Sequence, residues 1–218
     1  MAVLSGVIRV MEKAARKAGG RLRRDFGEIE HLQVSRKGPA DFVSKADMRA
    51  ERAIYDELLL ARPDWGFEME EAGTIEGKDG MPRWIVDPLD GTSNFLHGIP
   101  HFAISIAVQE RKLGSDDWGE VTAAVVYNPV TDETFWAEKS RGAWLHDARL
   151  RVSSRRNPSE ALIVLVQSVH RRAVQRSVED KSLLDLQLRG GDNPLHEAAV
   201  CWQQRGRRQT RPRGERLG

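Results

Sequence analysis

The chain has 218 residues, of which 40% are hydrophobic and 30% are charged, and its net charge at pH 7 is +2. This composition is typical of a globular protein in water, and the length allows one large domain or two small ones. The longest apolar runs, such as ALIVLV at 161–166, are far shorter than the roughly 20 residues of a membrane-spanning helix. The N-terminus has no apolar signal-peptide block and Cys201 is the single cysteine. We therefore expect a cytoplasmic protein with no membrane segment and no intrachain disulfide.

The small net charge hides an uneven distribution along the chain. Residues 1–153 carry 21 basic and 25 acidic side chains, whereas residues 154–218 carry 13 basic and 7 acidic ones. Twelve of those 13 basic residues are arginines. The change suggests two segments with different histories or different roles. Together with the elements and the resemblance described below, it leads us to expect an α+β unit over 1–160 and an atypical, arginine-rich and partly disordered segment over 161–218.

Two helices are predicted near the N-terminus. Apolar residues recur at three- and four-residue steps over 5–26, which indicates an amphipathic helix, although Gly19 and Gly20 weaken the pattern near its end. The segment VSRKGPADFVSKAD at 34–47 is expected to be a loop or hairpin. A second helix should begin near Ser44, with Asp47 in its first turn, and Pro63 should end it.

Strands follow the second helix. WGFEME at 65–70 and WIV at 84–86 are predicted as strands, with a polar loop over 72–83 between them. FAISIAV at 102–108 alternates as a half-buried strand does. VTAAVVYNPVTDETFWAE at 121–138 and GAWLHDARLRVS at 142–153 are predicted as hairpins. Beyond about residue 160 the periodicity weakens, and 203–218 is expected to be disordered.

The stretch WIVDPLDGTSNF at 84–95 runs from a buried strand directly into two carboxylates. Pro88 fixes its own φ and favours an extended conformation at Asp87. A turn with proline in its second position can bring the carboxylates of Asp87 and Asp90 to one side, with the Leu89 carbonyl between them. That all-oxygen arrangement is the kind that Mg²⁺ prefers.

The residues after Asp90 suit an anion. Gly91 permits close approach of the backbone, and Thr92 and Ser93 can open a helix whose free N–H groups face a phosphate. Metal and phosphate binding in one turn would indicate phosphoryl chemistry. The alternative is an Asx-type turn with a helix cap, which any isolated DPxD sequence can form.

The long segment DPLDGTSNFLHGIP resembles the first signature of the inositol monophosphatase family, Mg²⁺-dependent and lithium-sensitive sugar-phosphate phosphatases. The upstream segments GPADFVSKAD and MEEAG and the downstream strands from HFAISIAV to GAWLHDARLRVS resemble the same family, so the resemblance covers about residues 1–160. It implies a layered α-β-α-β-α sandwich, here with an incomplete second half. It also implies phosphomonoester hydrolysis, most simply of inositol 1- or 4-monophosphate by a metal-activated water, with fructose bisphosphate or phosphoadenosine nucleotides as alternative substrates.

The resemblance also implies a role for each matching residue, with two or three Mg²⁺ ions. Glu70, Asp87 and the Leu89 carbonyl would bind the first metal, and Asp87 with Asp90 the second. Asp47 would act on a third metal through water.

The remaining roles concern the water and the substrate. Thr92, with Asp47 or Glu70, would orient and deprotonate the attacking water, so these three are the predicted catalytic residues. The predicted substrate-binding residues are Asp90, Gly91, Thr92 and Ser93. Glu71 would support the ligands without contacting the metal.

Each of these residues also has a structural alternative. Asp47 could cap a helix, and Glu70 with Glu71 could be a solvated strand end. His97 and His101 are expected to be structural or to line the rim of the substrate site. Trp84 is expected to belong to the core.

One family feature does not occur in the sequence. The family's second signature, roughly Trp-Asp-x-Ala-Ala-Gly, is not found, because Trp202 is followed by Gln203 and LHEAAV at 195–200 is only a superficial echo. We therefore hypothesise a C-terminally truncated or frameshifted family member, with the change near residues 160–165. Weak or absent activity is expected, because the aspartate of that signature would complete the second metal site.

A second function class remains open. The chain could be a non-catalytic remnant that binds acidic partners or RNA through its basic tail, where six arginines follow residue 204. No aromatic platform accompanies these arginines, so nucleic-acid binding is the less favoured hypothesis. A homodimer is possible by analogy with the family.

Overall fold

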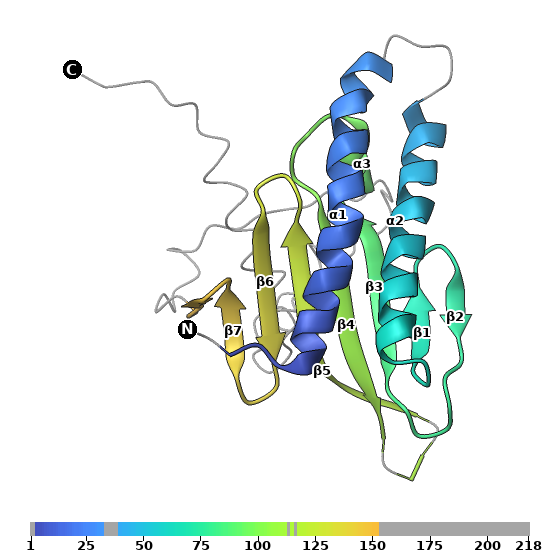
Figure 1. Ribbon diagram of the computed structural model, residues 1–218, viewed down its shortest axis with the longest axis vertical. Coiled ribbons are helices and arrows are strands. Elements are labelled where there is room, and N and C mark those ends of the chain that lie inside the picture. Colours follow the sequence, from blue (N-terminus) through green and yellow to red (C-terminus); the bar gives the residue numbers. More distant parts are fainter. Residues whose placement is uncertain (1–2, 33–38, 113, 116, 153–218) are drawn as a thin grey trace, which may run out of the picture.

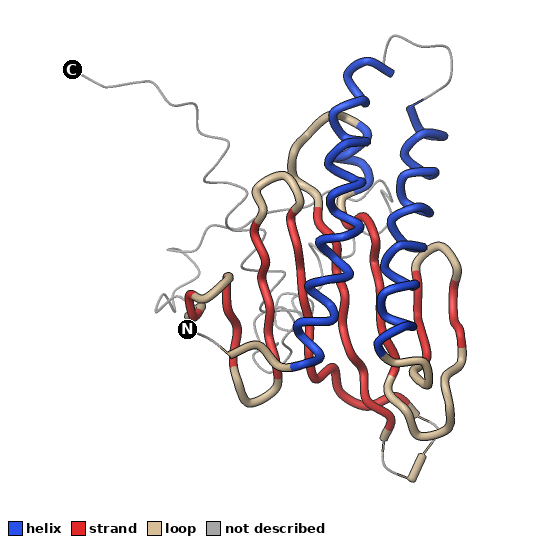
Figure 2. The backbone as a smooth tube through the Cα atoms, viewed as in Figure 1, coloured by secondary structure: helices blue, strands red, loops and turns tan. Residues whose placement is uncertain are grey.

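The computed structural model describes residues 3–32, 39–112, 114–115 and 117–152, which form one mixed β-sheet with two long helices across one face (Figures 1 and 2). The strand order is β2-β1-β3-β4-β5-β6-β7-β8, and only β1 and β3 among these neighbours run parallel. The elements are α1 (Gly6–Leu32), α2 (Pro39–Ala61), β1 (Gly66–Met69), β2 (Gly73–Ile75), β3 (Arg83–Asp90), α3 (Thr92–Leu96), β4 (Ala103–Arg111), β5 (Trp118–Asn128), β6 (Glu133–Glu138), β7 (Gly142–Leu145) and β8 (Ala148–Arg149).

The α+β fold class is confirmed, and the predicted strands at 65–70, 84–86 and 102–108 and both predicted hairpins are present. The helix pair and the sheet are two adjacent layers of the predicted sandwich. The other expected layers, the 161–218 segment and the Trp202 region lie outside the described residues. None of the described helices is long and apolar enough to cross a membrane.

Three local predictions were wrong. Residues 39–47 are helical rather than a loop, because Pro39 supplies the φ of a first helical turn and Val43 and Ala46 extend the buried stripe of α2 upstream. Ser44 therefore does not cap this helix. Residues 73–75, expected in a loop, form β2 by antiparallel pairing with β1. The first helix continues beyond residue 26 to Leu32.

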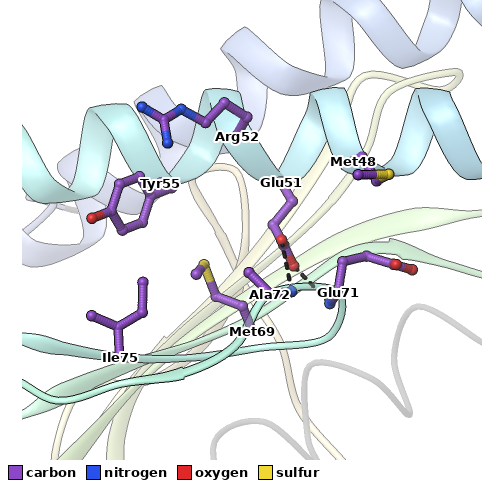
Figure 3. Close-up of a pocket in the computed structure, with 8 residues that line it drawn as sticks. All are labelled: Met48, Glu51, Arg52, Tyr55, Met69, Glu71, Ala72 and Ile75. Carbon is purple, nitrogen blue, oxygen red and sulfur yellow. Dashed lines mark hydrogen bonds between the residues drawn. The ribbon is translucent and has the colours of Figure 1, made fainter.

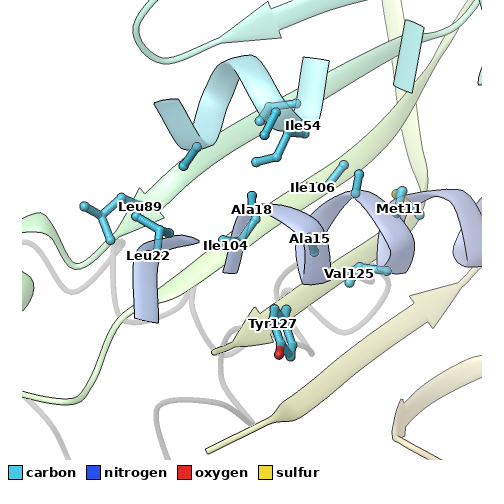
Figure 4. Packing of buried hydrophobic residues seen from close by; sticks show 14 of the residues in the cluster. Met11, Ala15, Ala18, Leu22, Ile54, Leu89, Ile104, Ile106, Val125 and Tyr127 are labelled. Carbon is cyan, nitrogen blue, oxygen red and sulfur yellow. The ribbon is translucent and has the colours of Figure 1, made fainter. Parts of the chain in front are cut away.

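The core lies between the helices and the sheet (Figure 4). Ile104 and Ile106 of β4 and Val125 of β5 are fully buried and face α1 and α2. The helices contribute apolar side chains of different sizes at helical spacing to the same cluster. These include Met11, Ala15, Ala18, Leu22 and Ile54.

Helix α1 approaches β5 most closely at Gly19. A Cβ atom there would lie 2.6 Å from Cε1 of Tyr127 and 3.0 Å from Cβ of Pro129. The tyrosine ring cannot retreat freely, because its hydroxyl donates to Asp132 over 3.0 Å and the Arg16 guanidinium lies 5.0 Å from its centroid. Gly19 is thus required by packing, although glycine disfavours a helix interior.

We expect Gly19→Ala to lower the free energy of unfolding by about 1–3 kcal/mol, because the added methyl group overpacks the contact with Tyr127. Gly20→Ala is the matched control. A Cβ at Gly20 meets nothing within 4 Å, so this variant should be neutral or up to about 1 kcal/mol more stable. Urea unfolding of the three proteins tests this, and equal midpoints for the two variants would contradict it.

Candidate metal and phosphate site

Glu70 and Asp87 lie side by side because β1 and β3 are parallel and in register. Their pairing ends with Met69 opposite Val86, so the next residue of each strand is a carboxylate at the same edge of the sheet. The carboxyl ends of parallel strands are a common location for ligand sites. Because of this register, two carboxylates that lie 17 positions apart in the sequence are neighbours in space.

The DPLD segment continues strand β3 rather than ending it. Asp87 pairs with Ser105 and Asp90 with Ala103 of β4, so β3 contains a bulge between the two aspartates. The Asp87 Oδ1 accepts a hydrogen bond from the Leu89 N–H over 3.1 Å, an Asx-type arrangement. Pro88 needs no ladder partner here because β1 has already ended. The predicted turn is therefore a bulged strand end.

Gly91 links this strand to the short helix α3. Its φ of +93° is disfavoured for other residues, and a Cβ would lie 3.1 Å from the His101 carbonyl oxygen. Asn94 donates to the same carbonyl over 2.7 Å, which ties α3 to the segment before β4. The Thr92 hydroxyl donates to the Leu89 carbonyl over 2.9 Å. The residues predicted to bind phosphate thus begin directly beside those predicted to bind metal.

Asp47 reaches the same region from α2. It lies more than two turns inside the helix rather than in the first turn, and it is only 3% exposed. Its Oδ1 is buried without a hydrogen-bond partner. A helix cap does not explain a buried carboxylate at this position, so that alternative is wrong.

The carboxylates of this cluster repel one another. Burial, and next the nearby Glu70, raise the pKa of Asp87 to about 8, with a side-chain hydrogen bond to Glu70 and the charge of Asp90 adding to the shift. Burial, followed by the charges of Glu71, Glu70 and Glu51, raises the pKa of Asp47 to about 7.

The pKa of Asp90 is also raised, first by desolvation and then by Glu70, and His101 opposes this shift. Glu70 is therefore a common neighbour of all three aspartates. Of the basic side chains in the described part of the chain, His101 is the one that acts on these pKa values.

The donor set fits a hard divalent cation. It consists of carboxylate and carbonyl oxygens, carries excess negative charge and includes the unpartnered Oδ1 of Asp47. Within the described residues, however, no three His, Cys, Asp or Glu side chains already surround one point in ligand geometry. A cation would have to draw the carboxylates together from their present separations.

The other predicted residues have distinct places. Trp84 is fully buried, and its ring packs against that of Trp65 with a centroid distance of 4.7 Å and a tilt of 37°, as a core residue does. The exposed His97 contacts the Ser93 carbonyl oxygen through Nδ1 over 2.7 Å, which fits a structural role. His101 is near enough to Asp90 to affect its pKa.

Glu51 was missed from the sequence. It is 5% exposed and accepts hydrogen bonds from the N–H groups of Glu71 and Ala72. Its position four residues after Asp47, on the buried stripe of α2 with Ile54, was the available signal, because a charged residue on such a stripe needs partners.

We expect Asp47→Asn to stabilise the metal-free protein at pH 8 by about 1–2 kcal/mol. The raised pKa of Asp47 means that its contribution to stability is fully present below pH 3.8 and is lost as the pH rises through about 7. The stabilisation by Asp47→Asn should therefore be smaller at pH 5 than at pH 8. Thermal unfolding of the variant and the wild type in EDTA at both pH values measures this difference.

Asp56→Asn is the control for this prediction, because Asp56 lies on the same helix in an exposed pair with Arg52. A stabilisation by Asp47→Asn that is equal at pH 5 and pH 8 would contradict the assigned origin of the repulsion.

Comparison with known proteins agrees with this architecture. An inositol-1-monophosphatase of Rhizobium meliloti (strain 1021) is 57% identical over 159 residues, which are 73% of this chain and 57% of that protein. The Nus factor SuhB of Vibrio cholerae is 42% identical over 67% of this chain and 52% of its own length. The crystal structure of the extragenic suppressor protein suhB from Bartonella henselae superposes with a TM-score of 0.60 at 55% identity, over 70% of this chain and 56% of that one.

The chain thus spans just over half the length of the curated relatives it matches. The model of the inositol monophosphatase family matches residues 3–198, which is most of the chain. The family match and the identity to these relatives show that this chain belongs to the inositol monophosphatase family.

Proposed function

We propose that this chain is a Mg²⁺-dependent phosphomonoester hydrolase and that its substrate is an inositol monophosphate. The observation that carries the proposal is the cluster of carboxylates around Glu70, in which burial and then the neighbouring carboxylates raise the pKa values of Asp47, Asp87 and Asp90. Fold stability alone disfavours such a cluster, whereas cation binding requires one. The choice of inositol monophosphate as the substrate is based on the relative from Rhizobium meliloti, which is named an inositol-1-monophosphatase.

Glu70, Asp87, Asp90 and the Leu89 carbonyl would hold Mg²⁺, with Asp47 acting on a further ion through water. When bound, the cations supply Lewis-acid stabilisation of the charge that develops on the phosphoryl group. The bulge in β3 serves this arrangement, because it presents Asp87, the Leu89 carbonyl and Asp90 within four consecutive residues.

The chain's own groups would orient the substrate and the water. Gly91 provides a backbone without a side chain next to the phosphate, and the N–H groups of Thr92 and Ser93 follow it. The Thr92 hydroxyl donates its hydrogen to Leu89. Its oxygen lone pairs therefore remain able to accept a hydrogen bond from the attacking water, with Asp47 or Glu70 accepting the proton.

The two segments have different parts in this proposal. Residues 1–160 carry the metal half of the phosphatase fold, and residues 161–218 replace the segment in which the family has its second signature. Because that signature would supply another metal ligand, we propose that turnover is weak. A homodimer and a cytoplasmic location belong to the same proposal.

Purified full-length chain should release phosphate from inositol 1-phosphate slowly and only with Mg²⁺. Asp90→Asn should reduce this release at least about a hundredfold, because it removes one charged ligand and halves the oxygens able to bind the cation. EDTA should abolish release in both proteins. Release that survives EDTA, or that is equal in the variant, would refute the proposal.

A second candidate function is a binding role. The Nus factor SuhB of Vibrio cholerae is 42% identical to this chain, and residues 154–218 of this chain are rich in arginine. We expect any RNA binding to fall steeply with salt, because arginine–phosphate contacts release counterions. Gel-shift titration of the full chain and of a variant lacking residues 204–218 tests this. Salt-independent binding, or unchanged binding after the deletion, would contradict it.

A further inference from the structure

Glu51 makes two hydrogen bonds that join α2 to the turn after β1 (Figure 3). Its Oε2 accepts from the Glu71 N–H over 2.9 Å, and its Oε1 accepts from the Ala72 N–H over 3.1 Å. Both carboxylate oxygens are therefore engaged by adjacent backbone groups. The side chain does not point at the carboxylate cluster itself but at the peptide units that follow Glu70.

Burial of this carboxylate is costly for the fold. Glu51 is 5% exposed, and no ion pair with a lysine or arginine is found for it among the described residues. A buried charge without a counterion is destabilising unless hydrogen bonds compensate it, and an apolar residue on this stripe of α2 would avoid the cost. Fold stability therefore does not explain why a glutamate occupies this position. Its two hydrogen bonds to the turn after β1 do.

The turn connects the antiparallel strands β1 and β2, and the pairing of Met69 with Gly73 closes it. Glu70, Glu71 and Ala72 are all exposed, so the bonds from Glu51 are what connects the turn itself to the helix layer. Fixing the N–H groups of Glu71 and Ala72 fixes the peptide planes that follow Glu70. It therefore sets the direction in which the Glu70 side chain leaves the backbone.

Glu70 is the residue of this turn that borders the carboxylate cluster, because it contributes to the raised pKa values of Asp47, Asp87 and Asp90 after burial. Rotation of the turn away from α2 would carry Glu70 away from these three aspartates. Two charge-assisted hydrogen bonds from a helix in the core resist that movement. Without them the turn could swing out into solvent and take Glu70 with it.

We propose that Glu51 is a positioning residue that holds the turn at 70–72, and so keeps Glu70 in place for Mg²⁺ before the cation binds. This role rests on the proposed function, because it concerns the same metal site. Glu51 contacts neither the metal nor the substrate and acts through the backbone next to Glu70.

The test compares Glu51→Gln with Glu57→Gln in the full-length chain. Glutamine keeps the shape but replaces one acceptor oxygen with an NH₂ group, so one of the two backbone bonds is lost. Glu57 lies on the same helix and pairs with Lys13 and Lys17 at 2.8 and 2.5 Å, so the control removes an equal charge away from the turn. Calorimetric titration with MgCl₂ measures affinity directly, without turnover.

Glu51→Gln should weaken Mg²⁺ binding about 10- to 100-fold, as changes to groups behind metal ligands commonly do. Glu57→Gln should leave the affinity within about twofold, even where its melting temperature falls. Equal Mg²⁺ affinity of Glu51→Gln and wild type would overturn the positioning role. A wild-type chain that binds no Mg²⁺ would overturn the proposed function as well.

Amide hydrogen exchange in the wild type tests the same role without a variant. The amides of Glu71 and Ala72 should be protected in EDTA as well as in MgCl₂, because Glu51 holds the turn before the metal arrives. Amides that exchange freely in EDTA and become protected only with MgCl₂ would show that the cation forms the turn, and would overturn the proposal even where phosphatase activity is found.

Discussion

The parallel pairing of β1 with β3 is the constraint on which the candidate site depends. Its register places Met69 opposite Val86, so that Glu70 and Asp87 leave the sheet together. Any slip by one residue would send one of the two carboxylates to the other face of the sheet. The bulge in β3 and the glycine at 91 then arrange Asp90 and α3 around this pair, while α2 delivers Asp47 from the layer above.

A stable core favours apolar side chains, whereas the candidate site needs buried carboxylates. The core between α1, α2 and the sheet is apolar, yet α2 carries the buried carboxylates Asp47 and Glu51 on its inner face. One of them has an unpartnered oxygen and the other is held by two backbone N–H groups. Such placement lowers stability locally, and functional sites are where proteins tolerate this cost.

Much of the fold could be predicted from local patterns. The alternation in FAISIAV and the hairpins around Asn128 and His146 correspond to strands that pack one apolar face against helices. Errors arose where a local signal was ambiguous. Ser44 suggested a helix start, but Pro39 and the buried Val43 extend α2 upstream. Residues 73–75 have no strong strand pattern, and their pairing with β1 made them a strand.

The sequence by itself determined the chemistry that the DPLDGTSNF segment offers and its membership of a family. These depend on residue type and short spacing, which local physics constrains strongly. The tertiary structure decided which distant carboxylates meet: it buried Asp47, placed Glu70 beside Asp87 just beyond the last strand pair, and gave Glu51 its two backbone partners. Those contacts depend on strand register and helix docking, which are set by the packing of the whole core rather than by any single segment.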